Sequence, residues 1–145
     1  MDFDTAMKFL ETAKALGRAK GVEVSVAILD AAGHPVLVAR GKKDAWHGPY
    51  MAMGKARLAA AFRKPTAELL KQWQDRPLYP TSLASVIPGG VTLNPGGYPI
   101  FDKGELVGAI GIGGSSPESD DETARKTVEA LGAAKPGTGK DKDKK

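Results

Sequence analysis

Three side chains suited to ligand binding crowd together just before an alanine-rich segment. Trp46, His47 and Tyr50 surround a Gly-Pro pair in the stretch DAWHGPYMAMGKARLAAAF. A neutral imidazole can ligate a metal or hydrogen-bond to a ligand, so His47 is the candidate metal ligand. The ring of Trp46 and the phenol of Tyr50 would offer flat apolar walls to a planar ligand, although packing or capping would equally explain His47.

Lys55 is the charged residue whose position most needs an explanation. A helical projection at about 100° per residue places it between Met51 and Phe62 on an apolar face. Burial of an unpaired ammonium costs several kcal/mol. Lys55 must therefore extend to solvent, pair with a carboxylate of the protein, or face a polar cavity. In such a cavity it would pair with the carboxylate of a ligand.

Two glycine-rich segments carry different predictions. In NPGGYPI, Gly96 and Gly97 could aim backbone N–H groups into a cleft, with Thr92 in the same loop. If that loop faces Lys55, the two could hold a small carboxylate. GAIGIGGSS ends a predicted hairpin strand instead of opening a βαβ unit, so nucleotide binding is not favoured. Its glycines would instead let a helix approach the strand closely.

Composition and charge exclude several function classes. The net charge is +4, but residues 135–145 hold five Lys and two Asp, so the remaining chain is close to neutral. Residues 134–145 are expected to be a disordered lysine-rich tail. No basic face with interleaved aromatic residues predicts nucleic-acid binding. No apolar run reaches the roughly 20 residues of a membrane span, and a cytoplasmic location is expected.

Other catalytic and metal motifs are not visible. The second histidine, His34, lies in a predicted turn and is expected to be exposed. No histidine and carboxylate spacing indicates a zinc or di-iron site. No nucleophile motif or acid–base pair is visible, so catalytic residues stay unknown.

Hydrophobic periodicity and turn residues predict one α+β domain over residues 1–133. A helix is expected at residues 3–20, a hairpin at 22–40, and a helix at 49–62 that begins at Pro49 with Gly48 as its cap. A short helix capped by Thr66 should follow, and then a short strand at 83–87. A second hairpin at 98–114 and a helix capped by Ser116 or Ser119 complete the prediction. The sheet should be mainly antiparallel.

The motifs together resemble the GlcG/HbpS-like family, which includes the C-terminal domain of PduO-type proteins. The resemblance rests on VAILDAAGHPVLVAR, MGKARLAAAFRKPT, GGYPIFDKGELVGAIGIGG and DDETA, in this order. It implies a profilin-like fold with a five-stranded antiparallel sheet, a homo-oligomer, and haem binding in some members. The segment RGKKDAWHGPY is one residue longer than the family pattern and lacks its serine. VTLNPGGYPI also departs from it.

Three functions remain open. The first is haem binding, which the resemblance implies, with Lys55 at a propionate. Haem iron is typically held by His, Cys, Met or Tyr, and the chain has no cysteine, so His47 and Tyr50 are the candidate axial ligands, with Met51 and Met53 behind them. The second is binding or turnover of a small carboxylate by Lys55 and the Gly96-Gly97 loop. The third is an oligomeric interaction module in which Trp46, Trp73 and Tyr79 are contact residues.

Overall fold

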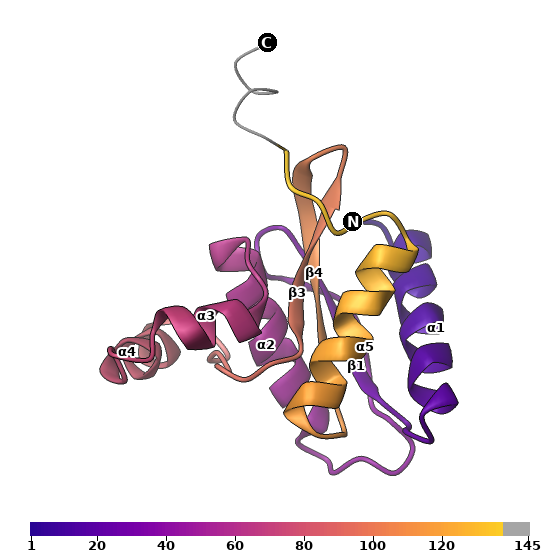
Figure 1. Ribbon diagram of the computed structural model, residues 1–145, viewed down its shortest axis with the longest axis horizontal. Coiled ribbons are helices and arrows are strands. Elements are labelled where there is room, and N and C mark those ends of the chain that lie inside the picture. The colour runs from indigo at the N-terminus through magenta and orange to yellow at the C-terminus, as the bar shows by residue number, and fades with distance from the viewer. Residues whose placement is uncertain (138–145) are drawn as a thin grey trace.

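The computed structural model describes residues 1–137, which form a single antiparallel sheet packed between helices (Figure 1). In chain order the elements are α1 (Phe3–Ala19), β1 (Ser25–Asp30), β2 (Pro35–Ala39), α2 (Gly48–Phe62), α3 (Thr66–Gln72), α4 (Leu78–Val86), β3 (Gly97–Asp102), β4 (Glu105–Gly113) and α5 (Pro117–Ala130). The strand order is β2-β1-β4-β3, and all neighbouring pairs are antiparallel. The α+β prediction is confirmed.

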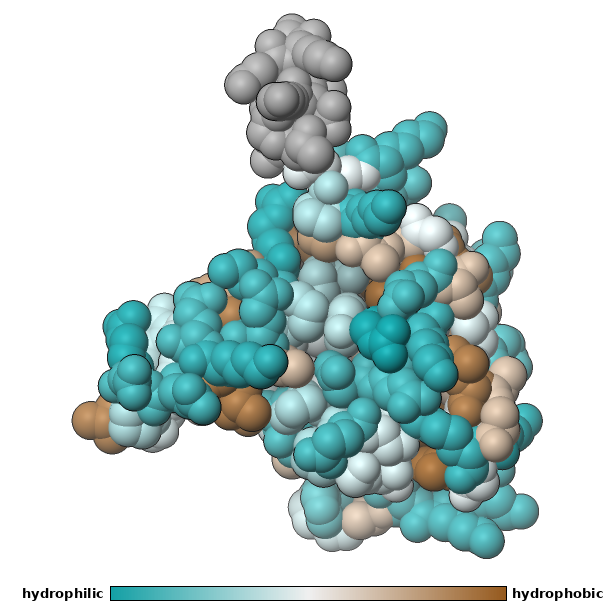
Figure 2. Space-filling view, in the orientation of Figure 1, coloured by the Kyte–Doolittle hydropathy of each residue, from teal (hydrophilic) through white to brown (hydrophobic). Residues whose placement is uncertain are grey.

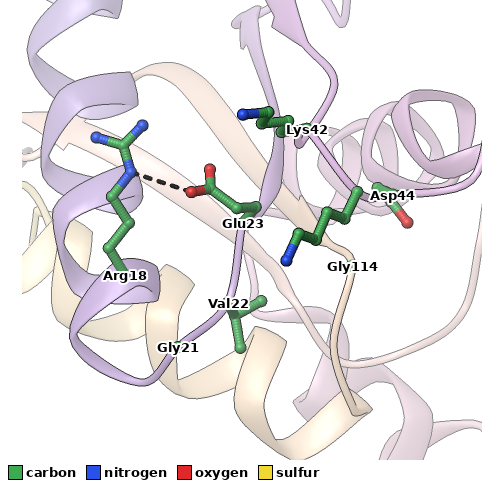
Figure 3. Close-up of a pocket in the computed structure, with 8 residues that line it drawn as sticks. Arg18, Gly21, Val22, Glu23, Lys42, Asp44 and Gly114 are labelled. Carbon is green, nitrogen blue, oxygen red and sulfur yellow. Dashed lines mark ion pairs between the residues drawn. The ribbon is translucent and has the colours of Figure 1, made fainter.

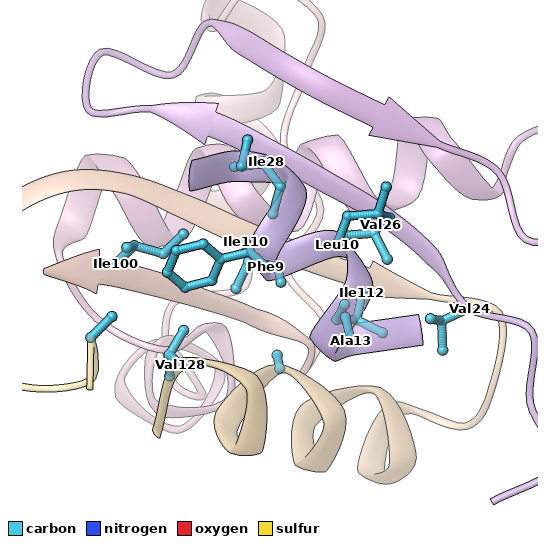
Figure 4. Packing of buried hydrophobic residues seen from close by; sticks show 13 residues of the cluster. Phe9, Leu10, Ala13, Val24, Val26, Ile28, Ile100, Ile110, Ile112 and Val128 are labelled. Atoms are coloured by element: carbon cyan, nitrogen blue, oxygen red, sulfur yellow. The ribbon is translucent and has the colours of Figure 1, made fainter. Parts of the chain in front are cut away.

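The two faces of the sheet carry side chains of different size. Val26 and Ile28 of β1 and Ile110 of β4 pack against α1 and α5, where Phe9 and Val128 complete the main core (Figure 4). The opposite face packs on α2 and is built from smaller groups. Its core cluster contains Leu29, Ala56, Ala59, Ala60 and Ala109. Small residues on both surfaces let α2 lie close to the sheet.

Gly111 shows how close that approach is. A Cβ added there would meet the backbone oxygen of Ala52 in α2, and Gly97 in β3 would clash with the backbone of Lys55 in the same way. The prediction that glycines of the last strand admit a helix is therefore confirmed for Gly111. Gly108 differs, because its added Cβ would meet the Leu29 carbonyl of the neighbouring strand.

The expected fifth strand is wrong. Residues 83–87 were expected to be extended, but most of them belong to α4, and the sheet described within residues 1–137 has four strands. Pro77 and Pro80 lie at or near the first turn of α4, where proline is tolerated. The hydroxyls of Ser82 and Ser85 donate to carbonyls three or four residues earlier, at 3.0 and 2.8 Å. The five residues from Leu83 to Ile87 are all apolar or small, so they show no hydrophobic period that distinguishes a strand from a helix.

Two helix starts also differ from the prediction. The cap of α3 is Pro65, and the Thr66 hydroxyl accepts instead from the Gly97 N–H at 2.9 Å. The cap of α2 is His47 and not Gly48, a shift of one residue. Ser116 caps α5 as predicted, and its hydroxyl accepts from the Ser119 N–H at 3.2 Å.

The segment after α5 is held along the β3–β4 hairpin. The Ala133 carbonyl accepts from the Phe101 N–H at 2.9 Å, and the Gly137 N–H donates to the Gly104 carbonyl at 2.8 Å. The predicted tail of residues 134–145 therefore begins with a hydrogen-bonded portion. The remainder of that tail lies outside the described residues.

Candidate functional site

The three ligand-type side chains at the start of α2 form one exposed cluster. The Trp46 ring lies edge-on to His47 at a centroid distance of 5.5 Å and edge-on to Tyr50 at 6.2 Å. Trp46 is 72% exposed and Tyr50 is 63% exposed, and the side chain of His47 is also exposed. Within residues 1–137 the His47 imidazole makes no hydrogen bond. We call Trp46, His47 and Tyr50 the aromatic cluster.

Asp44 and Ser25 fix the loop that carries this cluster. The buried Ser25 hydroxyl donates to Asp44 Oδ2 at 2.5 Å and accepts from the Gly41 N–H at 2.9 Å. A Cβ on Gly48 would overlap the Asp44 carboxylate, so only glycine leaves that carboxylate room at the start of α2. A negative charge is favoured there by the helix dipole. These contacts position the first turn of α2 and hence the aromatic cluster.

Lys55 pairs with a carboxylate, which is one of the three arrangements that its sequence position allowed. It is 3% exposed, and its ammonium donates to the Ile112 carbonyl at 2.8 Å and to Asp120 Oδ2 at 3.2 Å. Asp120 Oδ1 accepts from the Ser115 N–H at 3.1 Å. Lys55 therefore ties α2 to the end of β4 and the start of α5. The Asp120 carboxylate thus lies beside the ammonium, at the position that was expected for the carboxylate of a ligand.

The Gly96-Gly97 loop does face Lys55, but it packs directly on it. A Cβ on Gly96 would lie 3.1 Å from Lys55 Nζ and 2.8 Å from the Ile112 carbonyl, and the φ of Gly96 is +126°. Thr92 lies against Gly54 of α2, where an added Cβ would meet its hydroxyl. The loop thus covers the buried ion pair, and the place expected for a small carboxylate is taken by Asp120.

Burial raises the pKa of several acidic groups around the start of α5. Desolvation raises the pKa of Asp120, and the nearby Lys55 ammonium opposes it. Desolvation also raises the pKa of Asp121, whose Oδ1 is buried without a hydrogen-bond partner in residues 1–137. Burial and the Asp121 charge raise the pKa of Tyr98 to about 12. These groups favour their neutral forms more than exposed ones would.

The structure also places the second histidine, His34, and the second tryptophan, Trp73. The side chain of His34 is 78% exposed, as predicted, and its Nδ1 lies 3.7 Å from Asp30. Trp73 is 4% exposed and packs edge-on against Phe62 and Tyr79. Trp73 is therefore a core residue and not an exposed contact. In the part of the chain that the structure describes, no cluster of three His, Asp or Glu could hold a metal ion.

Comparison with known proteins decides the family. The model of a family described as haem-degrading, HbpS-like proteins matches residues 1–129. The chain belongs to the HbpS-like family. No curated protein matches the chain.

Solved structures agree with this family membership. A double mutant of HbpS from Streptomyces reticuli is 30% identical, with a TM-score of 0.80 over 90% of this chain and 86% of that one. The PduOC–haem complex is 28% identical, with a TM-score of 0.82 over 94% of this chain and 99% of that one. The ORFY protein of Klebsiella pneumoniae is 20% identical with a TM-score of 0.81 over 92% and 91%, which shows a shared fold.

Sequence reasoning missed two polar partners that organise the site. Asp120 lies in the first turn of α5, where the helix dipole alone would favour an acidic side chain. Ser25 opens β1 as a buried polar residue ahead of four apolar ones, and this exception was the available signal for a buried hydrogen bond. Neither residue shows its distant partner in the linear sequence.

Proposed function

We propose that the protein binds haem through the aromatic cluster, with His47 as the axial ligand. The observation that carries this proposal is an exposed imidazole, free of hydrogen bonds within residues 1–137, beside two exposed aromatic rings. Exposed apolar side chains that lie together on a surface are a feature of many binding sites. Membership of the HbpS-like family and likeness to a haem complex support the same function.

The residues present fit the chemistry of haem. Imidazole nitrogen is a common axial donor, and the indole of Trp46 and the phenol of Tyr50 suit contact with a flat apolar ring. The phenol oxygen of Tyr50, three residues along α2, is the alternative axial donor. Bound haem would supply an iron centre whose reactivity depends on its axial ligand and surroundings.

Lys55, Thr92, Gly96 and Gly97 have a supporting part in this proposal. Lys55 anchors α2 to the sheet, and the loop from Thr92 to Gly97 covers it. Their contribution is to hold the helix that presents His47. The proposal is one of binding, and it assigns no catalytic residue.

Titration of the purified protein with hemin tests the proposal. A Soret band that saturates at one haem per chain is expected. His47→Ala should weaken binding by at least about tenfold, and Tyr50→Phe should show whether the phenol oxygen contributes. His34→Ala is the matched control, because it removes the other exposed imidazole. Equal binding by all four proteins would remove the assignment of His47 and Tyr50.

We also infer that the protein forms a homo-oligomer through the arm made by α3 and α4. This arm projects from the sheet and helices in Figure 1, and brown apolar surface lies on it in Figure 2. No residue of α4 is buried, while Leu78 is 77% exposed and Val86 is 73% exposed. A second copy would cover these side chains.

A further inference from the structure

A cleft of about 530 Å³ lies at the end of α1, beside the loop that leads to α2 (Figure 3). Its charged lining comes from three separate segments. Arg18 belongs to α1, Glu23 precedes β1, and Lys42, Lys43 and Asp44 belong to the loop between β2 and α2. The volume falls within the roughly 300–1,000 Å³ typical of small-molecule sites.

The two acidic residues of the cleft are already engaged by the protein. Glu23 Oε1 lies 3.4 Å from Arg18 Nε. Asp44 accepts from the Ser25 hydroxyl and, at 2.9 Å, from the Ala45 N–H. Lys42 and Lys43 have no carboxylate within 4 Å among residues 1–137. Three cations and two carboxylates therefore line the cleft, and Lys42 and Lys43 are the cations left without an ion pair among residues 1–137.

The cations stand at separate positions around the opening. In Figure 3 the ends of Arg18 and Lys42 lie on either side of Glu23. Arg18 contacts Glu23 through Nε, and its two terminal nitrogens make no hydrogen bond within residues 1–137. The planar end of a guanidinium matches a carboxylate, whereas an ammonium acts as a point charge. Two separated positive groups suit two separated carboxylates better than one compact anion.

Glycine keeps this cleft open. Gly114 follows β4 with a φ of +104°, and a Cβ there would lie 3.3 Å from the Glu23 carbonyl and 3.6 Å from the Asp44 carboxylate. A side chain at that position would fill the wall of the cleft. Gly21, with a φ of +78°, has no atom within 4 Å of its added Cβ. The backbone therefore leaves space beside the cations.

We propose that this cleft binds a molecule that bears two carboxylate groups. Two sources have this chemistry: a free small dicarboxylate, and the two propionates of haem. The second source rests on the proposed function, and the first does not. The site is distinct from the buried Lys55–Asp120 pair, which has no open charge to offer a ligand.

The first arm of the test uses succinate and the ligand-free full chain. Amide signals of Gly21 and Gly114 in ¹⁵N–¹H spectra should shift and saturate as succinate is added. Lys42→Ala/Lys43→Ala should weaken binding by at least about tenfold, because two charges are lost. Lys8→Ala/Lys71→Ala removes the same charge from exposed sites elsewhere and should leave binding unchanged. Acetate and inorganic phosphate, at matched ionic strength, should bind more weakly.

The second arm compares hemin with its dimethyl ester, which lacks free propionate charges. If propionates occupy the cleft, the Lys42→Ala/Lys43→Ala variant should bind hemin at least about fivefold more weakly and the ester equally well. Unchanged hemin affinity together with succinate binding assigns the cleft to a free dicarboxylate. Loss of neither interaction in that variant, or equal binding of phosphate and succinate, would overturn the proposal. Failure of the wild type to bind hemin would refute the proposed function alone, since the succinate arm does not depend on it.

Discussion

Lys55 shows how one buried charge can hold three elements together. Lys55→Met would leave the Asp120 carboxylate buried without its cation, and we expect a loss of about 3–5 kcal/mol in the free energy of unfolding. Chemical denaturation measures this loss. Lys55→Met/Asp120→Asn should cost less than the two single changes added together, because the pair is removed as a unit. Strictly additive costs would show that the 3.2 Å contact contributes no coupling.

The partly buried carboxyl group of Asp121 should make the free energy of unfolding depend on pH. Burial raises its pKa in the folded state, so its carboxyl group favours folding most when protonated. That contribution is present below the unfolded pKa, near 3.8, and is lost as the pH rises through the folded value. Asp121→Asn should therefore be more stable than the wild type at pH 7, and the difference should shrink toward pH 3. Denaturation curves at several pH values test this. A difference that grows in acid would contradict the assigned direction.

At the scale of elements, the fit of α2 on the sheet depends on missing side chains. Gly111→Ala would place a Cβ against the Ala52 carbonyl, and overpacking of this kind costs about 1–3 kcal/mol or more. Gly113→Ala is the matched control in the same strand, because its Cβ would lie 3.4 Å from the Gly48 carbonyl, an ordinary contact. Thermal unfolding should separate the two variants. Equal melting temperatures would mean that α2 can move away at little cost.

Most elements could be predicted from periodicity and turn residues. The helix of residues 3–19, both hairpins and the Ser116 cap follow from local signals that tertiary contacts reinforce. The strand predicted at residues 83–87 is wrong because a short apolar segment fits a strand or a helix equally well. The prediction that Thr66 caps α3 is wrong because its hydroxyl accepts from Gly97, a distant residue that no local rule reveals.

In the candidate site, too, features set by sequence neighbours were predictable and features set by distant residues were not. Trp46, His47 and Tyr50 lie together because they are neighbours in sequence, and their closeness was predictable. Whether Lys55 joined them depended on Asp120, which is distant in the chain and supplies the compensating charge. A buried lysine indicates that some partner exists, but only the folded chain identifies it.

At the scale of the whole molecule, the projecting arm predicts self-association. Light scattering after size exclusion should give a mass greater than 15.2 kDa for the wild type. Leu78→Lys/Val86→Lys should lower that mass, because two exposed apolar side chains of α4 become charged. Leu131→Lys, on another part of the surface, is the control. A wild type that stays monomeric at every concentration would contradict the assembly.

No helix within residues 1–137 is long and apolar enough to cross a membrane.

Three surface features carry the proposals: the aromatic cluster, the cationic cleft beside its loop, and the apolar arm. The first two adjoin one loop, which Ser25 and Asp44 fix against the sheet. Both candidate binding features therefore lie at one end of the layered fold, while the arm extends from another part of it (Figure 1).

The most direct test of the central claim locates the iron relative to the two histidines. Because the chain has only His34 and His47, histidine-selective ¹⁵N labelling gives two sets of signals that single variants can assign. On addition of hemin, the account predicts that the His47 signals shift strongly or broaden beyond detection while those of His34 persist. Unchanged His47 signals in a haem-saturated sample would contradict the account.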